Sequence, residues 1–254
     1  MLSKNKQKFI LSLNRKKVRE QAGVFVAEGH KLVSDLLSAE CIAKQLIATE
    51  RWIKENKNLL TSSTEITEAS NDEIKKISTH KSPPEVIGIF NQVNKGLLLD
   101  SLRNELCLFL DEIQDPGNLG TIVRLADWFG IKHIICSTTC ADIYNAKTIQ
   151  STMGAISRVN VYYQESTDFL KQYTRLNLPV YGTFLDGKNI YDQKLSNHGL
   201  IIMGNEGKGI SEDVSRFVSH KLFIPSFPAE TPTSESLNVS VATAITCAEF
   251  RRQA

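Results

Sequence analysis

The chain has 254 residues, of which 41% are hydrophobic and 23% charged, the composition of an ordinary globular protein with one large or two modest domains. No apolar run approaches the roughly 18 residues that a transmembrane helix needs. The first residues lead into no apolar signal core. Five cysteines, an odd number with no Cys-x-x-Cys pair, indicate reduced thiols, so we expect a cytoplasmic protein that does not contact a membrane.

The net charge of +2 hides a basic segment near the N-terminus. Between Lys4 and Arg19 there are seven cations and no acid. Such a run is most often a solvated basic face, but clustered Lys and Arg also bind nucleic acid by releasing counterions from its phosphates. Composition alone leaves both interpretations open.

Residues 1–95 have the pattern of a small α/β domain. Apolar spacing predicts helices over Lys6–Val18 and His30–Ala39, with Gly23 ending the first helical stretch. The other expected elements are three strands and a short helix: Val24–Ala27, Gln45–Thr49, Val86–Phe90 and Asn71–Ser78. A polar segment around Gln92–Leu98 ends this domain, and we place the boundary after residue 95.

Residues 96–254 alternate strands and helices more regularly. The expected strands are Leu106–Leu110, Lys132–Cys136, Val180–Leu185, Leu200–Met203 and Leu222–Ile224. The expected helices are Asn118–Phe129, which Gly130 ends, Asp168–Leu176 and Leu237–Phe250. This alternation predicts an α/β domain with a largely parallel sheet.

Three segments of the second domain carry residues that a scaffold does not need. The first, Asp115–Arg124 (DPGNLGTIVR), follows a strand and opens a helix, where backbone N–H groups favour anions. Taken alone, Asn118 would be an N-cap and Arg124 a surface arginine.

The second segment, Met203–Ile210 (MGNEGKGI), has three glycines directly after an apolar strand, so the backbone must turn sharply or approach a ligand closely. Its glycine order excludes a Rossmann fingerprint, and Gly209 after Lys208 excludes a P-loop. The third segment, Ser234–Ala242 (SESLNVSVA), opens the last helix, with Ser236 as a plausible N-cap and Asn238 in the first turn.

Together and in this order, the three segments resemble the signature motifs of the SpoU (TrmH-like) RNA ribose 2′-O-methyltransferases. The matching patterns are Asn-Leu-Gly-x-x-x-Arg, Gly-Asn-Glu-Gly-x-Gly-Ile and Ser-Leu-Asn-Val-Ser-x-Ala. The resemblance covers about Leu106 to Phe250. Arg15–Asp35 is also similar to the family's N-terminal substrate-binding domain.

The resemblance implies a SPOUT-type α/β domain over residues 96–254, with a parallel sheet and a C-terminal trefoil knot, after a small α/β (L30e-like) RNA-binding domain over residues 1–95. It also implies S-adenosylmethionine as methyl donor, an RNA substrate, no metal, and a homodimer with its active site at the subunit interface. By position, the implied catalytic residues are Asn118, Arg124, Glu206, Ser236 and Asn238. The implied cofactor-binding residues are Gly204, Glu206, Gly207, Ile224, Leu237 and Val239. The implied RNA-binding residues are Arg15, Lys16, Lys17, Arg19 and Arg124.

One stretch departs from the family pattern. Pro225–Ser234 is longer than expected between the second and third motifs, carries three prolines and lacks the glycine common there. The resemblance therefore assigns no donor contacts to residues 226–233. The five histidines share no metal-ligand spacing, in keeping with the absence of a metal.

Methyl transfer to a ribose hydroxyl needs close positioning, a path for the hydroxyl proton, and a site that tolerates loss of the sulfonium charge. The family gives the proton to the arginine matching Arg124, although a guanidinium ordinarily stays protonated. Two roles stay open for Arg124: a base, or a clamp on the adjacent phosphate while water takes the proton. Glu206 would orient Arg124 or the ribose, and Asn118, Ser236 and Asn238 would supply hydrogen bonds.

Two other functions are compatible with parts of the sequence. An inactive RNA-binding relative could use the same dimer, but the presence of Asn118, Arg124, Glu206 and Asn238 favours an active enzyme. An ordinary Rossmann methyltransferase is disfavoured, because no glycine-rich loop of the required form follows the first strand of the second domain. The separate N-terminal domain favours 23S ribosomal RNA as substrate, with tRNA as the alternative.

Overall fold

The computed structural model describes residues 2–62, 64–93, 96–228 and 236–254. Two compact units make up the chain: unit 1 is Met1–Asn94 with Asp142–Arg158, and unit 2 is Lys95–Ala141 with Val159–Ala254. The boundary expected after residue 95 falls at residues 94–95, outside the described ranges. Residues 142–158, expected in the second domain, group with unit 1. Within the described ranges, no helix is long and apolar enough to cross a membrane.

Unit 1 is built on a four-stranded sheet in the order β1-β4-β2-β3, in which β4 runs antiparallel to both neighbours and β3 parallel to β2. Its strands are β1 (Val24–Glu28), β2 (Ala43–Ala48), β3 (Glu65–Glu68) and β4 (Val86–Asn91). Its helices are α1 (Lys4–Ser12), α2 (Lys16–Ala22), α3 (His30–Ser38), α4 (Glu50–Glu55), α5 (Asn71–Lys75) and α7 (Ala146–Thr152).

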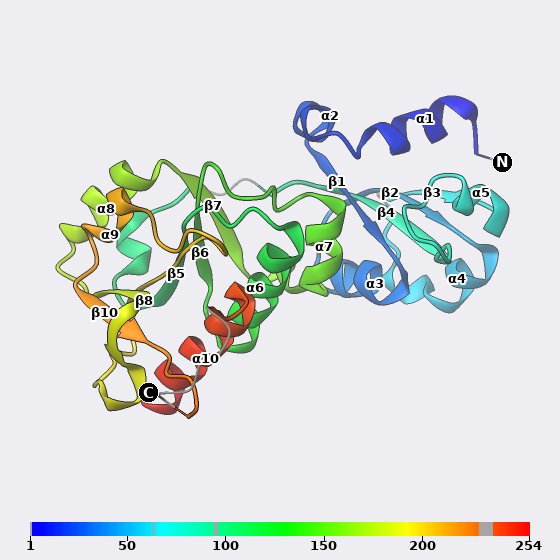
Figure 1. Cartoon of the computed structure of the whole chain (residues 1–254). Coiled ribbons are helices and arrows are strands. Elements are labelled where there is room, and N and C mark those ends of the chain that lie inside the picture. The colour runs from blue at the N-terminus through cyan, green and yellow to red at the C-terminus, as the bar shows by residue number, and fades with distance from the viewer. Residues whose placement is uncertain (1, 63, 94–95, 229–235) are drawn as a thin grey trace. The chain divides into compact units, whose positions relative to one another are not determined.

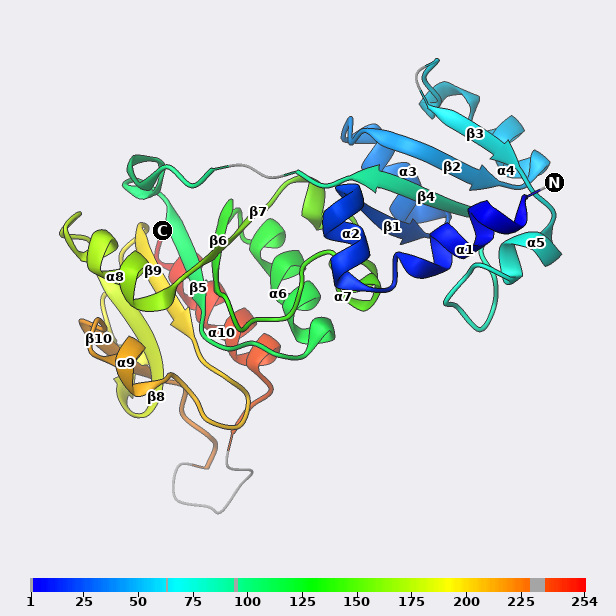
Figure 2. The ribbon, with the colours of Figure 1, turned by 90° about the horizontal axis from the view of Figure 1, so that it is seen from above.

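Helices pack on both faces of this sheet (Figure 2). One face buries Leu46 and Phe90 with side chains of α3, α4 and α7. The other face buries a sequence neighbour of each, Ile47 and Ile89, with side chains of α1 and α5. Because successive strand residues point to opposite faces, a sheet covered on both sides needs continuous apolar runs, which is what the sequence has.

The single helix expected over Lys6–Val18 is wrong, because the chain breaks between α1 and α2. Leu13 is buried at the break, and Arg15 has extended backbone angles as the residue before α2. The Leu13 carbonyl, which a continuous helix would bond to a later backbone N–H, accepts a hydrogen bond from Nη1 of Arg19 at 2.7 Å. Elements α4, β3 and α7 were not expected, and in unit 2 the strand Asn160–Gln164 and the helix Glu212–Ser215 were also missed.

Arg19 lies inside unit 1, where its Nη2 donates to Oδ2 of Asp142 at 2.5 Å. The two side chains are only 4% and 17% exposed, respectively. Arg19 therefore does not belong to the exposed RNA-binding face expected for it, which is a correction. The partner acid lies 123 residues away along the chain.

We expect Asp142→Asn to lower the free energy of unfolding by about 3–5 kcal/mol, because it leaves the guanidinium buried without its counter-charge. Urea unfolding of the full chain measures this loss. The matched control is Lys16→Gln, which breaks an exposed pair with Glu20 (3.8 Å) and should lower stability by less than about 1 kcal/mol. Equal losses in the two variants would contradict the prediction.

Unit 2 holds a six-stranded sheet in the order β10-β8-β9-β5-β6-β7, and all of its strand pairs are parallel. Its strands are β5 (Leu106–Leu110), β6 (His133–Ser137), β7 (Asn160–Gln164), β8 (Val180–Asn189), β9 (Gly199–Met203) and β10 (His220–Phe223). Its helices are α6 (Pro116–Trp128), α8 (Ser166–Thr174), α9 (Glu212–Ser215) and α10 (Val239–Arg252). The α/β class and the parallel sheet are confirmed, while the trefoil knot stays a prediction.

The arrangement of this sheet places three loops at one edge. Helix α6 lies beside α10 (Figure 1), while α8 and α9 bury Phe169 and Val214 with Phe109 and Ile202 of the sheet. Because the strands are parallel, the carboxyl ends of β5, β9 and β10 share an edge, and ligands of open α/β sheets bind outside that edge. The three strands lead there into the segments that the sequence singled out.

Candidate active site

Asn118 stands in the first turn of α6. Asp115 is the N-cap of this helix and its Oδ1 accepts a hydrogen bond from the Asn118 backbone N–H at 2.9 Å, with Pro116 as the first helical residue. Asn118 is therefore not the N-cap that its position suggested. Since Asp115 caps the helix, the Asn118 side chain is released for other partners.

Four side chains, which we call the amide cluster, join the three motifs: Asn118, Glu206, Asn238 and Ser240. Nδ2 of Asn118 donates to Oε1 of Glu206 at 2.7 Å. Oδ1 of Asn118 accepts from Nδ2 of Asn238 at 3.1 Å and from Oγ of Ser240 at 3.3 Å. The structure thus brings together three of the five predicted catalytic residues, from α6, from the loop after β9 and from the start of α10.

The amide orientations in this cluster follow from its hydrogen bonds. Oδ1 of Asn238 accepts from the backbone N–H of Ser240 at 2.9 Å, which leaves Nδ2 of Asn238 to donate to Asn118. Asn118 then faces Asn238 with its oxygen and Glu206 with its nitrogen. A rotated amide would place like groups against each other at both contacts. The Glu206 carboxylate is held by the same orientation, because its Oε1 accepts from Nδ2 of Asn118.

The loop after β9 is closed tightly on itself. Asn205 and Gly209 exchange two backbone hydrogen bonds of 2.9 Å. A Cβ on Gly204 would lie 2.3 Å from the carbonyl carbon of Gly209 and 2.3 Å from the backbone nitrogen of Ile210. Only glycine fits at position 204, because the loop backbone occupies the space of a side chain.

Asn205 holds this loop to the rest of the edge. Its Nδ2 donates to the Glu112 carbonyl at 2.8 Å, and its Oδ1 accepts from the backbone N–H groups of Gly207 and Lys208 at 2.9 and 3.1 Å. The loop is thereby fixed to the segment between β5 and α6. Glu206, between these anchored residues, is presented to Asn118.

The start of α10 differs from the expectation. Its N-cap is Asn238, and Ser236 lies two residues earlier, exposed and without a hydrogen bond to another described residue. The expected cap at Ser236 is wrong, because the Asn238 side chain makes the capping bond. Leu237 is half-exposed, and Val239 is buried in the first turn.

Arg124 is not joined to the amide cluster. It lies six residues beyond Asn118 on α6, about 9 Å along the helix axis at 1.5 Å per residue. Its side chain is exposed and makes no hydrogen bond or ion pair with another residue of the described ranges. The basic residues Arg15, Lys16 and Lys17 of unit 1 are also exposed.

Two of the buried cysteines are poor nucleophiles. Burial raises the pKa of Cys107 and of Cys247 to about 12, so both thiols stay protonated at neutral pH. Cys140 plays a structural part, since its Sγ accepts from the Ile113 backbone N–H at 3.3 Å and donates to the Leu110 carbonyl at 3.2 Å. Within the described ranges, no three His, Cys, Asp or Glu side chains gather as a metal site.

Three residues of the site were missed by the sequence reasoning: Asp115, Asn205 and Ser240. The signal for Asp115 was available, because an acidic residue directly before proline is typical of an N-cap followed by the first helical residue. Ser240 lies two residues after Asn238, but nothing in the sequence shows that its hydroxyl reaches Asn118. Asn205 belongs to the second motif, but nothing in the sequence shows that its side chain holds the loop.

The sequence profile of the SpoU rRNA Methylase family matches residues 105–248, and that of the MRM3-like substrate binding domain matches residues 4–88. The 23S rRNA (guanosine(2553)-2′-O)-methyltransferase RlmP of Bacillus subtilis is 28% identical over 235 residues, which are 92% of this chain and 90% of that protein.

Solved structures agree. A structure from Porphyromonas gingivalis assigned to the TrmH family of RNA methyltransferases has a TM-score of 0.89 at 36% identity, covering 100% of both chains. The AdoMet-bound rRNA methyltransferase of Sinorhizobium meliloti has a TM-score of 0.87 at 28% identity, covering 99% of this chain and 97% of that one. The resemblance drawn from the three motifs is confirmed: the chain belongs to the SpoU rRNA Methylase family.

Proposed function

We propose that this protein methylates a ribose 2′-hydroxyl of ribosomal RNA in the cytoplasm, with S-adenosylmethionine as the methyl donor. The amide cluster is the observation that carries the proposal, because it joins all three family motifs through direct hydrogen bonds. An inactive RNA-binding relative would have no need to keep this cluster intact. The active enzyme is therefore the better supported of the two.

The loops around the cluster suit an adenosyl group. Gly207 is exposed and a Cβ there would meet only Oδ1 of Asn205, at 3.7 Å, while Ile224 after β10 and Leu237 before α10 add apolar side chains. The cofactor would be held through backbone groups and apolar contacts by Gly204, Gly207, Ile224 and Leu237. Buried Val239 would support the position of Leu237. When bound, S-adenosylmethionine supplies a methyl group on a sulfonium.

Glu206 and the asparagines would position the ribose. Asn118 occupies Oε1 of Glu206, and Oε2 makes no hydrogen bond to another described residue. Oε2 can therefore accept a hydrogen bond from the ribose, and Asn118 and Asn238 each keep one amide N–H for the substrate. These groups are held before substrate binds, so little ordering is needed at the moment of reaction. Exposed Ser236 would add a hydroxyl at the rim.

Arg124 acts in this proposal as a clamp on the phosphate beside the target ribose, and water takes the hydroxyl proton. A guanidinium binds phosphate with two parallel N–H groups and ordinarily stays protonated. The exposed position of Arg124, apart from the amide cluster, suits contact with an incoming phosphate better than proton transfer inside the cluster.

Ribosomal RNA is favoured over tRNA by the similarity to a full-length relative. The relative from Bacillus subtilis, named as a 23S rRNA methyltransferase, is matched over nine-tenths of both chains. Unit 1 contains the match to the MRM3-like substrate binding domain. In this proposal the exposed cations Arg15, Lys16 and Lys17 contact RNA phosphates.

We also propose a homodimer that pairs through α6 and α10, with the trefoil knot in the same unit. Trp128 on α6 is 83% exposed and Val241 on α10 is 48% exposed. Large exposed apolar side chains on two neighbouring helices are typical of a subunit interface, and a buried Trp is a frequent anchor of such interfaces.

Cofactor binding can be tested by calorimetry in the presence of a chelator, where wild-type protein should bind S-adenosylmethionine. Gly204→Ala should weaken that binding about tenfold or more, because the added methyl group meets loop backbone that must shift. Gly96→Ala, with open space around it, is the matched control and should bind normally. Unchanged affinity in Gly204→Ala would place the donor elsewhere.

The role of Arg124 can be tested by methyl transfer to ribosomal RNA. Arg124→Ala should lower the rate by roughly 100- to 1,000-fold, the size typical for removal of one electrostatic contact in a reaction site, while cofactor affinity stays within about twofold. Arg124→Lys should be nearly as slow, because an ammonium lacks the guanidinium fork. Arg175→Ala, on α8's exposed end, should act like wild type. Loss of cofactor affinity with activity would show a structural role.

The oligomeric state can be tested by sedimentation. Wild-type protein should sediment with a mass twice the 28.4 kDa of one chain. Trp128→Glu should be a monomer at micromolar concentration, because the dimer would bury a charge in the interface. Leu185→Glu changes another exposed apolar side chain, 78% exposed on β8, and should leave the dimer intact. A wild-type monomer, or dissociation by both variants alike, would contradict the assigned interface.

A further inference from the structure

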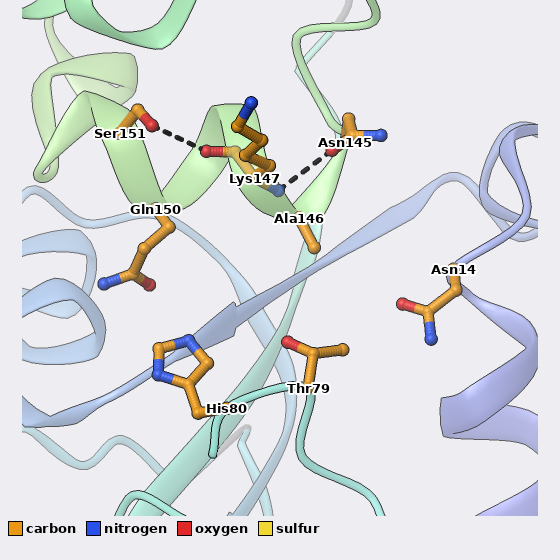
Figure 3. Close-up of a pocket in the computed structure, with 8 residues that line it drawn as sticks. All are labelled: Asn14, Thr79, His80, Asn145, Ala146, Lys147, Gln150 and Ser151. Carbon is orange, nitrogen blue, oxygen red and sulfur yellow. Dashed lines mark hydrogen bonds between the residues drawn. The ribbon is translucent and has the colours of Figure 1, made fainter. Parts of the chain in front are cut away.

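Unit 1 contains a hollow of about 450 Å³, and none of the amide-cluster residues lines it. Figure 3 shows three segments around it: the link between α1 and α2, the loop before β4, and α7 with its N-cap. The lining residues are Asn14, Thr79, His80, Asn145, Ala146, Lys147, Gln150 and Ser151. Its size lies within the roughly 300–1,000 Å³ typical of small-ligand sites.

The loop that lines one side is held firmly by a buried carboxylate. Oε1 of Glu28, at the end of β1, accepts from the Thr79 hydroxyl at 2.7 Å and from the Thr79 backbone N–H at 3.1 Å. Oε2 of Glu28 accepts from the Ser78 hydroxyl at 2.5 Å. These bonds satisfy the buried acid and fix the position of His80 beside the hollow.

On the opposite side, α7 presents side-chain amides. Oδ1 of Asn145 accepts from the Lys147 backbone N–H at 2.9 Å, which leaves Nδ2 of Asn145 without a bond to another described residue. The side chains of Asn14, His80 and Gln150 likewise make no hydrogen bond within the described part of the chain. Figure 3 shows Gln150 and His80 facing each other across the hollow, with Asn14 on the third side.

Basic residues are among the lining residues or next to them in sequence. The lining residues include Lys147 and no acid, Asn14 is followed by exposed Arg15, Lys16 and Lys17, and His80 is followed by exposed Lys81. Cations at a rim hold phosphates, amides read the donors and acceptors on a base edge, and an imidazole stacks on a base face. An anion alone would need no amides, and a duplex would offer no free base to a hollow of this kind.

We propose that this hollow binds one unpaired nucleotide of the substrate RNA. Its base lies against His80 with its edge toward the amides of Asn14 and Gln150, and its phosphates meet the neighbouring cations. The proposal deepens the proposed function, on which it rests for the identity of RNA as substrate. It gives unit 1 a part in choosing the RNA sequence, beyond general attraction to phosphates.

The test measures fluorescence anisotropy of full-length protein with labelled decauridylate and decaadenylate over a range of salt concentrations. The double variant Asn14→Ala/Gln150→Ala should bind the preferred oligonucleotide about tenfold more weakly, because base-edge hydrogen bonds are lost. The difference in affinity between decauridylate and decaadenylate should become smaller for the same reason. The slope of log affinity against log salt should stay unchanged, since amides carry no charge. The comparison variant Arg15→Ala/Lys16→Ala/Lys17→Ala should lower that slope by about 0.7 for each phosphate contact.

The matched control is Gln21→Ala/Asn58→Ala, which removes exposed amides of the same types from unit 1 outside the hollow. It should bind both oligonucleotides like wild type. As a second measurement, wild-type protein is photo-crosslinked to 4-thiouridine RNA, and the crosslinked peptides should contain residue 14, residues 79–80 or residues 145–151.

The inference is overturned if the hollow variant binds as tightly as wild type, if wild type binds neither oligonucleotide, or if crosslinks fall only outside these segments. Methyl transfer to ribosomal RNA, measured in parallel, separates this failure from failure of the proposed function. If wild-type protein transfers methyl groups normally and the Asn14→Ala/Gln150→Ala variant binds RNA like wild type, only the proposed nucleotide site is rejected. Absent transfer together with hollow-dependent binding rejects the methyltransferase proposal and supports the nucleotide site.

Discussion

The side-chain amide of Asn118 is the contact on which the active edge of unit 2 depends. It donates to Glu206 and accepts from Asn238 and Ser240, so a single planar group connects α6, the loop after β9 and the start of α10. Aspartate could not donate to a carboxylate, and leucine could neither donate nor accept. An asparagine at this position is therefore required by the polarity of its neighbours. The cap at Asp115 makes this possible, because it frees Asn118 from the helix end.

The other half of the edge depends on backbone. The turn at Gly204 is closed so tightly that loop backbone fills the place of a side chain, and Asn205 ties the turn to the Glu112 carbonyl. This arrangement holds Glu206 within hydrogen-bond distance of Asn118. The closed backbone of the loop thereby keeps the carboxylate of Glu206 in place.

The sequence predicts the sheets and the motif convergence better than the details of capping. Strands β5 and β9 are continuous apolar runs, and Gly23 and Gly130 end helices with φ of 63° and 64°, as their positions indicated. The parallel order of the strands then brings the motif loops to one edge.

Other features depend on contacts that no local pattern contains. The ion pair that buries Arg19 joins residues 123 positions apart, so this arginine could not be told from its exposed neighbours in the basic run. Ser236 and Asn238 are both good capping residues, and only the folded chain shows that Asn238 makes the bond. Helix α7 was missed because it is short and carries polar residues on the side away from the sheet, where they line the hollow.

The chain path gives α7 a significance that its length does not suggest. Residues 142–158 lie between two segments of unit 2 in sequence but pack in unit 1, where Ile149 joins the core and Tyr144 stacks on Phe25 with ring centroids 5.1 Å apart. Unit 1 therefore completes its core only when the chain has continued well into unit 2. The same segment supplies one wall of the hollow and the acid that neutralises Arg19. Folding of unit 1 is thus covalently tied to unit 2, because neither the core nor the hollow of unit 1 can be made from residues 1–94 alone.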